Sequence, residues 1–225
     1  MLNEDFVFLV EEFGKPAKAQ RLPAGLAARF HGKLPRGLID LWQEYGLGLW
    51  LKGKFQFCLP DSYAPIVAAV LRDDPVFKPH RTHAYGYTAF GELYLWNEDY
   101  QNLDINLPRL WGAAMMTQDD WTPGDPDIEI AAHLTGLDRK GAADWHEDSE
   151  TASPMFEHVR KTRGELALGE CYGFVPALLL GGDAKVECVQ RLQALEHFAI
   201  LAQLGPVSLF DYTDMQQRFV RSLGG

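Results

Sequence analysis

Residues 49–114 carry short runs of aromatic and aliphatic residues that are separated by turn-forming residues, and this spacing limits the folds open to the chain. LWLKGKFQF (49–57) predicts two strands around Lys52-Gly53, and YGYTAFGELYLWN (85–97) predicts a hairpin that turns near Phe90-Gly91. Further short strands are expected around 102–106 and 109–114. Strands this short, joined by tight turns, favour an antiparallel sheet.

Helix signals precede and interrupt the predicted strands. EDFVFLVEEF (4–13) has the acidic and apolar spacing of a short amphipathic helix, and in LPRGLIDLWQEYG (34–46) Pro35 opens a second helix that Gly46 ends. A third helix is expected over 61–72. The mixture predicts an α+β fold with mixed helices and an antiparallel sheet, in two closely packed subdomains.

The composition changes between residues 118 and 150. This segment contains ten acidic residues and only two basic ones, Arg139 and Lys140, so its local net charge is −8. A helix is expected from Pro126 to Leu137, with Asp125 as its cap. A further helix begins near Ser153-Pro154 and ends at Gly164. We predict three parts: 1–115, an acidic connecting segment 116–152, and 153–225.

The run YGFVPALLLGG (172–182) predicts a buried segment of strand length that leads into a turn, although its periodicity is also compatible with a helix. Pro176 favours an interrupted strand or an edge strand. GGDAK (181–185) lacks the spacing of a phosphate-binding loop, so it is interpreted as a turn and helix start. A helix is therefore expected from Asp183, and another in the last twenty residues.

The whole-chain charge restricts the class of partner. The sequence has 225 residues, 21 Lys and Arg against 31 Asp and Glu, and a formal net charge of −10. A chain of this charge repels nucleic acid, so we expect no nucleic-acid partner. Three widely spaced cysteines, no export signal and no long apolar stretch predict a cytoplasmic protein that does not bind a membrane.

Catalytic and metal-binding patterns are weak in this sequence. His80 and His83 lie three apart, and His146 has acidic neighbours, but neither group matches a known zinc-ligand spacing. The cysteines Cys58, Cys171 and Cys188 lie in apolar surroundings, which disfavour a reactive thiolate. We therefore expect no catalytic residues, no metal and no cofactor.

The acidic segment is the strongest candidate for a contact with a partner protein. Carboxylates can take the places of DNA phosphates on a basic protein, and Trp is enriched at binding hot spots. The alternative is a solvated linker whose tryptophans pack back on the fold. The hypothesis names ten residues: Asp119, Asp120, Trp121, Asp125, Asp127, Glu129, Asp144, Trp145, Glu147 and Asp148.

Two parts of the chain resemble known families. YGFVPAL, LGG and EHFAILAQL, within 170–206, are similar in order and spacing to the C-terminal domain of bacterial immunity proteins that neutralise DNase effectors of type VI secretion systems. FGKP (13–16), LPRGLIDLWQEYG (34–46) and GELYLWN (91–97) resemble the GAD-like domain that precedes it.

The resemblance implies a GAD-like domain over 1–115 and an immunity domain over 153–225. It implies a cytoplasmic protein without catalytic activity that binds the nuclease toxin domain of a co-encoded effector and keeps it off the producer's DNA. Two alternatives stay open: a metal-dependent hydrolase that uses His80, His83 or His146, and a regulatory adaptor without a toxin partner.

Overall fold

The protein is described by a computed structural model, which covers residues 2–23, 25–117, 121–139, 144–145, 154–211 and 218–224. Its main sheet has nine strands: β1 (Ala17–Gln20), β2 (Leu47–Trp50), β3 (Phe55–Phe57), β4 (Thr82–Thr88), β5 (Glu92–Asn97), β6 (Gln101–Asn106), β7 (Trp111–Ala114), β10 (Val207–Asp211) and β11 (Arg218–Leu223). All neighbours pair antiparallel except β7 and β10, which are parallel. A separate two-stranded sheet pairs β8 (Glu170–Phe174) with β9 (Val189–Gln193).

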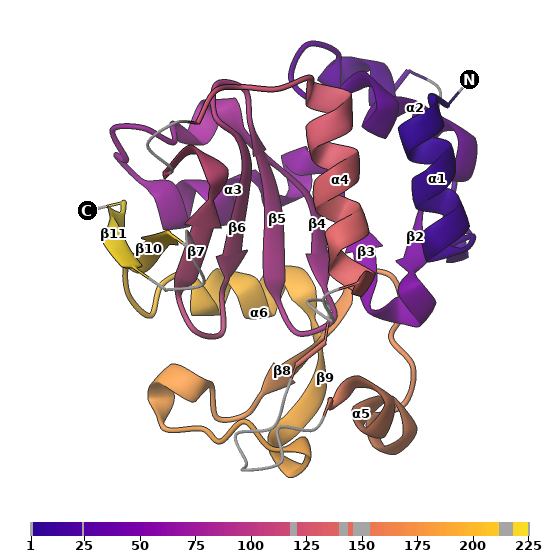
Figure 1. Ribbon diagram of the computed structural model, residues 1–225. Coiled ribbons are helices and arrows are strands. Elements are labelled where there is room, and N and C mark those ends of the chain that lie inside the picture. Colours follow the sequence, from indigo (N-terminus) through magenta and orange to yellow (C-terminus); the bar gives the residue numbers. More distant parts are fainter. Residues whose placement is uncertain are drawn as a thin grey trace.

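Helices lie on both faces of the main sheet (Figure 1). They are α1 (Glu4–Phe13), α2 (Arg36–Tyr45), α3 (Pro60–Leu71), α4 (Pro126–Arg139) and α6 (Ala194–Leu201), whereas α5 (Phe156–Arg163) lies below the main sheet beside β9. Helices α1, α2 and α4 share one core with strands β2 to β5, whereas α3 and α6 share a second core with strands β4 to β6 and with β10.

Strand β5 contributes side chains to both cores. Leu93 and Leu95 are buried beneath α3 and α6, and Tyr94 and Trp96 are buried on the face that carries α1, α2 and α4. Successive side chains of a strand point to opposite faces, so a strand buried on both faces is apolar or aromatic at consecutive positions. The sheet is therefore the middle layer of three.

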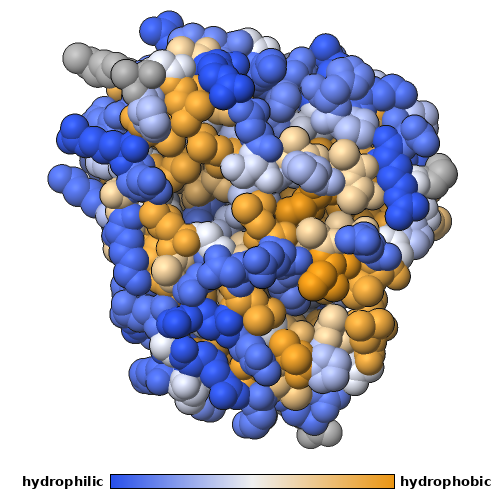
Figure 2. All heavy atoms as spheres, turned by 180° about the vertical axis from the view of Figure 1, so that it is seen from behind, coloured by the Kyte–Doolittle hydropathy of each residue, from blue (hydrophilic) through white to orange (hydrophobic). Residues whose placement is uncertain are grey.

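A third core lies below the main sheet, where β8, β9 and α5 meet the β4–β5 turn (Figure 1). Phe90 of that turn stacks on Phe174, with ring centroids 6.2 Å apart, and packs on Tyr172. Seen from behind, apolar side chains gather across the middle and lower right of the molecule, the region of α6 and the β8–β9 connection (Figure 2).

The C-terminal strand β11 is fastened to the loop after α3 by a buried ion pair. Arg221 donates to both carboxylate oxygens of Asp74, whose side chain is fully buried. The N–H groups of Val76 and Phe77 donate to the same carboxylate. Burial alone would raise the pKa of Asp74, but these hydrogen bonds outweigh it and hold the pKa below its ordinary value.

The α+β architecture with a mainly antiparallel sheet confirms the predicted fold class. The helices over 4–13, 34–46 and 126–137 and the hairpin at Phe90-Gly91 are present within a few residues of their predicted bounds. Gly91 has φ +91°, the left-handed conformation that the turn requires. The division at residues 115 and 152 stays a prediction.

Two predicted helices in the C-terminal part are wrong. After Asp183 the chain forms a short 3₁₀ turn (Val186–Cys188) and then β9, because Val189 faces Phe174 across the β8–β9 ladder. In the last twenty residues β10 and β11 replace the expected helix. Val207 and Leu209 alternate with outward residues and are buried in the core under α3 and α6, which is strand periodicity.

Candidate partner-binding site

The first turn of α4 and its cap carry three of the six described residues of the predicted acidic contact: Asp125, Asp127 and Glu129. Asp125 caps the helix, because its Oδ1 accepts hydrogen bonds from the N–H groups of Asp127 (2.9 Å) and Ile128 (3.3 Å). Pro126 follows as the first helical residue, as predicted. Asp125 is exposed, so its carboxylate meets solvent as well as the helix end.

Asp127 joins the N-termini of three helices. Its Oδ1 accepts a hydrogen bond from the N–H of Gly37 in the first turn of α2 (2.8 Å), and its Oδ2 accepts one from the side chain of Asn3 (3.3 Å). Asn3 is the N-cap of α1, where its Oδ1 accepts from the N–H of Phe6. A carboxylate is stabilised at helix N-termini by the free N–H groups and the helix dipole.

A groove of about 580 Å³ opens beside these helix ends. Its walls come from the loop before α2, the end of β5 and the turn that leads into α4. The lining residues that carry charge or an aromatic ring are Lys33, Arg36, Trp96, Glu98, Asp99, Asp125 and Asp127.

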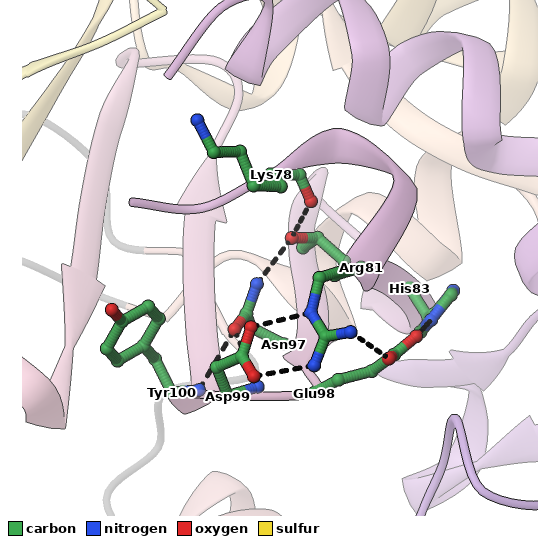
Figure 3. Close-up of polar contacts among 8 residues, drawn as sticks. Lys78, Arg81, His83, Asn97, Glu98, Asp99 and Tyr100 are labelled. Atoms are coloured by element: carbon green, nitrogen blue, oxygen red, sulfur yellow. Dashed lines mark hydrogen bonds and ion pairs between the residues drawn. The ribbon is translucent and has the colours of Figure 1, made fainter. Parts of the chain in front are cut away.

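The turn between β5 and β6 holds two of these acids in place (Figure 3). The fully buried Asn97 donates to the hydroxyl of Thr82 (2.8 Å) and accepts from the N–H groups of Asp99 and Tyr100. These hydrogen bonds fix the backbone that presents Glu98 and Asp99 to the groove. The sequence interpretation missed this turn, although Asn97 and its acidic neighbours form a recognisable turn signal.

Arg81 neutralises much of the charge at this wall. Its guanidinium forms a two-pronged pair with Asp99 (2.5 and 2.6 Å) and also reaches Glu98 (3.2 Å), which in turn meets His83 (2.7 Å). The hydrogen bonds from Arg81 hold the pKa of Asp99 below its ordinary value. With Lys33 and Arg36 on the opposite side, the groove is nearly balanced in charge, so it does not by itself resemble a run of phosphates.

Trp121 and Glu129 complete the group near the start of α4. The Trp121 ring lies 6.2 Å from the ring of Tyr100 and is half-buried. The half-buried Glu129 side chain occupies the space beside Gly124, where a Cβ would collide with its carboxylate. The structure therefore brings Trp121, Asp125, Asp127 and Glu129 to one end of the molecule.

Asp144 and Trp145 lie elsewhere and belong to the third core. The Asp144 side chain is 6% exposed, pairs with Lys54 (3.0 Å) and accepts a hydrogen bond from the N–H of Phe156, the first residue of α5. Trp145, also 6% exposed, packs on Phe174 with ring centroids 5.1 Å apart. Both side chains stabilise the fold and offer little surface to a partner.

Of the other candidate residues, some lie outside the described part of the chain and the rest do not form a site. Asp119, Asp120, Glu147 and Asp148, together with His146, lie outside the described residues. His80 is exposed, and His83 is held by Glu98. Across the described part of the chain, no three His, Cys, Asp or Glu side chains lie close enough to hold a metal ion.

Beneath α4 the sheet carries a titratable cluster that the sequence interpretation did not single out. His133 of α4 contacts Asp104 of β6 (2.9 Å), and Tyr94 donates to the carboxylate of Glu92 (3.4 Å). Burial and the neighbouring Asp104 raise the pKa of Glu92 to about 8. The cluster follows from strand register, since Tyr94 pairs with Asp104 directly across β5 and β6.

Two family models match the chain: the GAD-like domain over residues 4–109, and the C-terminal domain of the type VI secretion (T6SS) immunity protein Tdi1 over residues 139–205. The crystal structure of Atu4351 from Agrobacterium tumefaciens is similar over 99% of this chain and 98% of that chain, with 32% sequence identity and a TM-score of 0.90. The chain belongs to the family of GAD-like type VI secretion immunity proteins. No curated protein matches it significantly.

The immunity protein exposes part of the run that was expected to be core. Within the matched C-terminal domain, Cys171 to Phe174 are buried in β8, but Val175, Leu179 and Leu180 are exposed, Leu180 by 64%. The prediction of a buried segment is therefore wrong after Phe174. The strand ends there because Pro176 has no N–H to continue the ladder, and the chain turns outward before it returns as β9.

No helix in the described part of the immunity protein is long and apolar enough to cross a membrane.

Proposed function

We propose that this immunity protein binds the nuclease domain of a co-encoded type VI effector in the producer's cytoplasm and prevents it from cleaving DNA. The observation that carries the proposal is the match of residues 139–205 to the Tdi1 immunity domain. The full-length similarity to Atu4351 supports a conserved arrangement of both domains. The protein acts by binding and without catalysis.

The charge of the chain supports a DNA-cleaving target. A nuclease holds its substrate with Lys and Arg side chains, and a partner with a net charge of −10 is attracted to such a surface. Carboxylates at the interface would occupy positions that phosphates take in the DNA complex. Steric closure of the cleft by the bulk of the protein would complete the inhibition.

The proposed contact begins at the start of α4, where Trp121, Asp125 and Glu129 lie together near the surface. Asp127 contributes by holding three helix ends at this place. Asp119, Asp120, Glu147 and Asp148 remain part of the proposal, and Asp144 and Trp145 act in it as supports of α5.

The affinity must be high because protection has to hold at low concentrations of toxin. A dissociation constant of about 1 nM corresponds to roughly −12 kcal/mol. A specific interface of about 1,600 Å² is sufficient for such affinity when a few anchors are well buried. Acidic steering speeds association and weakens with salt.

The test is a DNA-degradation assay of the toxin domain, titrated with this protein at 50 and 300 mM salt. Complete inhibition near one equivalent is expected, with slower association at high salt. A triple variant Trp121→Ala, Asp125→Asn, Glu129→Gln should weaken inhibition, whereas Asp183→Asn, an exposed acid of the β8–β9 connection, is the matched control. Undiminished DNA cleavage at large molar excess would contradict the proposed function for that effector.

A further inference from the structure

Helices α1 and α4 lie side by side on the outer surface of the molecule (Figure 1). Asn3 and Asp127 join their first turns, so the two helices run in the same direction. Between them is a groove of about 430 Å³ whose floor consists largely of the small residues Ala131, Ala132 and Gly136. A Cβ added at Gly136 would meet no atom within 4 Å, so this part of the floor has open space above it.

A large apolar side chain stands on each side of the groove. Phe8 of α1 is 41% exposed and Ile128 of α4 is 53% exposed. Neither is needed for the core, because α1 buries Phe6, Leu9 and Phe13 and α4 buries its own apolar stripe. Together with the alanine floor these side chains form a contiguous apolar patch, and such a patch rimmed by polar residues is typical of a binding surface.

Phe8 is surrounded on the surface of α1 by acidic residues. On a helix surface, the neighbours of a residue are those three and four positions away. For Phe8 all four of these neighbours are acidic: Glu4, Asp5, Glu11 and Glu12. Helix α1 contains no Lys or Arg, and Asp125 stands three residues before Ile128.

We propose that the α1–α4 groove is a docking site for a basic amphipathic helix of the toxin domain. The inference rests on the proposed function and adds to it the structural class of the segment that is recognised. An apolar ridge on that helix would contact Phe8, Ile128 and the alanine floor, and flanking Lys or Arg side chains would meet the carboxylates of α1. Peptide helices are commonly recognised by grooves of this kind.

The dimensions of the groove define its occupant. From Ile128 to Gly136 the helix rises about 12 Å, a little more than two turns. An occupant of this length presents two or three apolar anchors spaced by three or four residues. The small side chains of the floor allow its backbone to come close. A second copy of this chain is a poor occupant, because the exposed α1 would bring carboxylates against carboxylates.

The first experiment fills the groove. Ala132 is exposed, and Ala132→Arg places a long cation above the groove floor, where it excludes a helix and repels basic side chains. The matched control is Ala68→Arg, at an exposed alanine of α3 on the other face of the sheet. Both variants are titrated against the toxin domain of the effector encoded next to the gene, and circular dichroism checks the fold.

We expect Ala132→Arg to raise the dissociation constant at least 100-fold and Ala68→Arg to leave it within twofold. Phe8→Ser provides a second variant, which removes the apolar side chain on the α1 side of the groove, with an expected loss of 10-fold or more. If the toxin domain binds the wild type and both groove variants with equal affinity, the groove proposal is overturned while the proposed function stands.

The second experiment tests the basic character of the occupant. Replacing Glu4, Asp5, Glu11 and Glu12 together by Gln or Asn should weaken toxin binding and flatten its salt dependence. A photo-crosslinking residue in place of Phe8 should capture a toxin peptide rich in Lys and Arg. Capture of an acidic or uncharged peptide, or of a second copy of this chain, contradicts the proposed occupant.

A third measurement keeps the two proposals separable if the wild type binds no toxin domain. A 14-residue helical peptide that has Leu at i, i+4 and i+7 and Lys beside them is added to the free protein. Chemical shifts of the protein's amide groups, measured by NMR, are the readout. Shifts at Ala131, Ala132 and Gly136, absent with the Glu counterpart of the peptide, support the groove. Shifts absent from these amides overturn it.

Discussion

The carboxylate of Asp127 on α4 accepts a hydrogen bond of 2.8 Å from the backbone N–H of Gly37 on α2, across 90 positions of sequence. Helix α2 has no side-chain cap of its own, since Pro35 occupies its N-cap position. Asp144 does the same for α5, whose N-cap Met155 also makes no side-chain cap bond. Two acids of the predicted contact thus cap helices other than their own, one 90 and the other 12 positions away in sequence.

Asp127→Ala should therefore destabilise the fold. Loss of a helix-capping carboxylate costs about 1–2 kcal/mol, and here the Asn3 contact is lost as well. Urea unfolding at pH 7 measures the difference. Asp183→Ala, which removes only an exposed pair with Lys185, is the control and should cost less than about 0.5 kcal/mol. Equal effects of the two variants would show that the distant cap contributes nothing.

The Asp74–Arg221 pair predicts a loss of stability in acid. Because the pKa of Asp74 is lowered in the folded state, its contribution is present above the unfolded value, about 3.9, and is lost as pH falls through the folded pKa. Asp74→Asn should cost about 2 kcal/mol at pH 7. Urea midpoints between pH 2 and 7 should show the wild type and variant converging below about pH 4; a constant difference would contradict the prediction.

The raised pKa of Glu92 predicts that the free energy of unfolding decreases, rather than increases, as the pH rises above about 4.5. Its pKa of about 8 lies above the unfolded value, so the folded state holds the proton more tightly and stability falls as pH rises from about 4.5 to 8. Glu92→Gln should remove that slope, which is at most about 1.4 kcal/mol per pH unit. Denaturation at pH 5, 6.5 and 8 measures it, with the exposed Glu196→Gln as control. A wild type whose stability is level over this range would refute the assignment.

The apolar run 172–182 predicts two different responses to substitution. Phe174 is buried in the third core, so Phe174→Ala should cost about 3–5 kcal/mol. Leu180 is largely exposed, so Leu180→Ser should change the free energy of unfolding by less than about 0.5 kcal/mol. Thermal and urea unfolding of both variants make the comparison. A large loss for Leu180→Ser would place its side chain in the core after all.

Local signals account for the parts of the fold that were predictable. Asp125 and Pro126 indicate the start of α4. The acidic first turn and the spacing of apolar residues indicate α1. Strands β9 and β10 were missed because each is decided by a distant partner. Val189–Gln193 becomes a strand opposite β8, and Val207–Asp211 becomes one beside β7, whatever helical spacing their residues show.

The candidate site shows the same limit. Charge and Trp density marked 118–150, but they could not separate Asp125, which meets solvent, from Asp144 and Trp145, which are buried. Side chains of one type cap a helix, pair with a lysine or face water according to what the rest of the chain brings beside them. That information comes from the packing of α2 and α5, which lie outside the segment.

The parallel pairing of β7 with β10 also sets the order of events during synthesis. About 90 residues separate the two strands, so a ribosome working at 5–20 residues per second exposes the free edge of β7 for roughly 5–20 s before β10 is made. Until then the nascent chain offers an open ladder to any other strand. The edge of β7 is therefore the place in the main sheet where a wrong strand could pair before β10 is available.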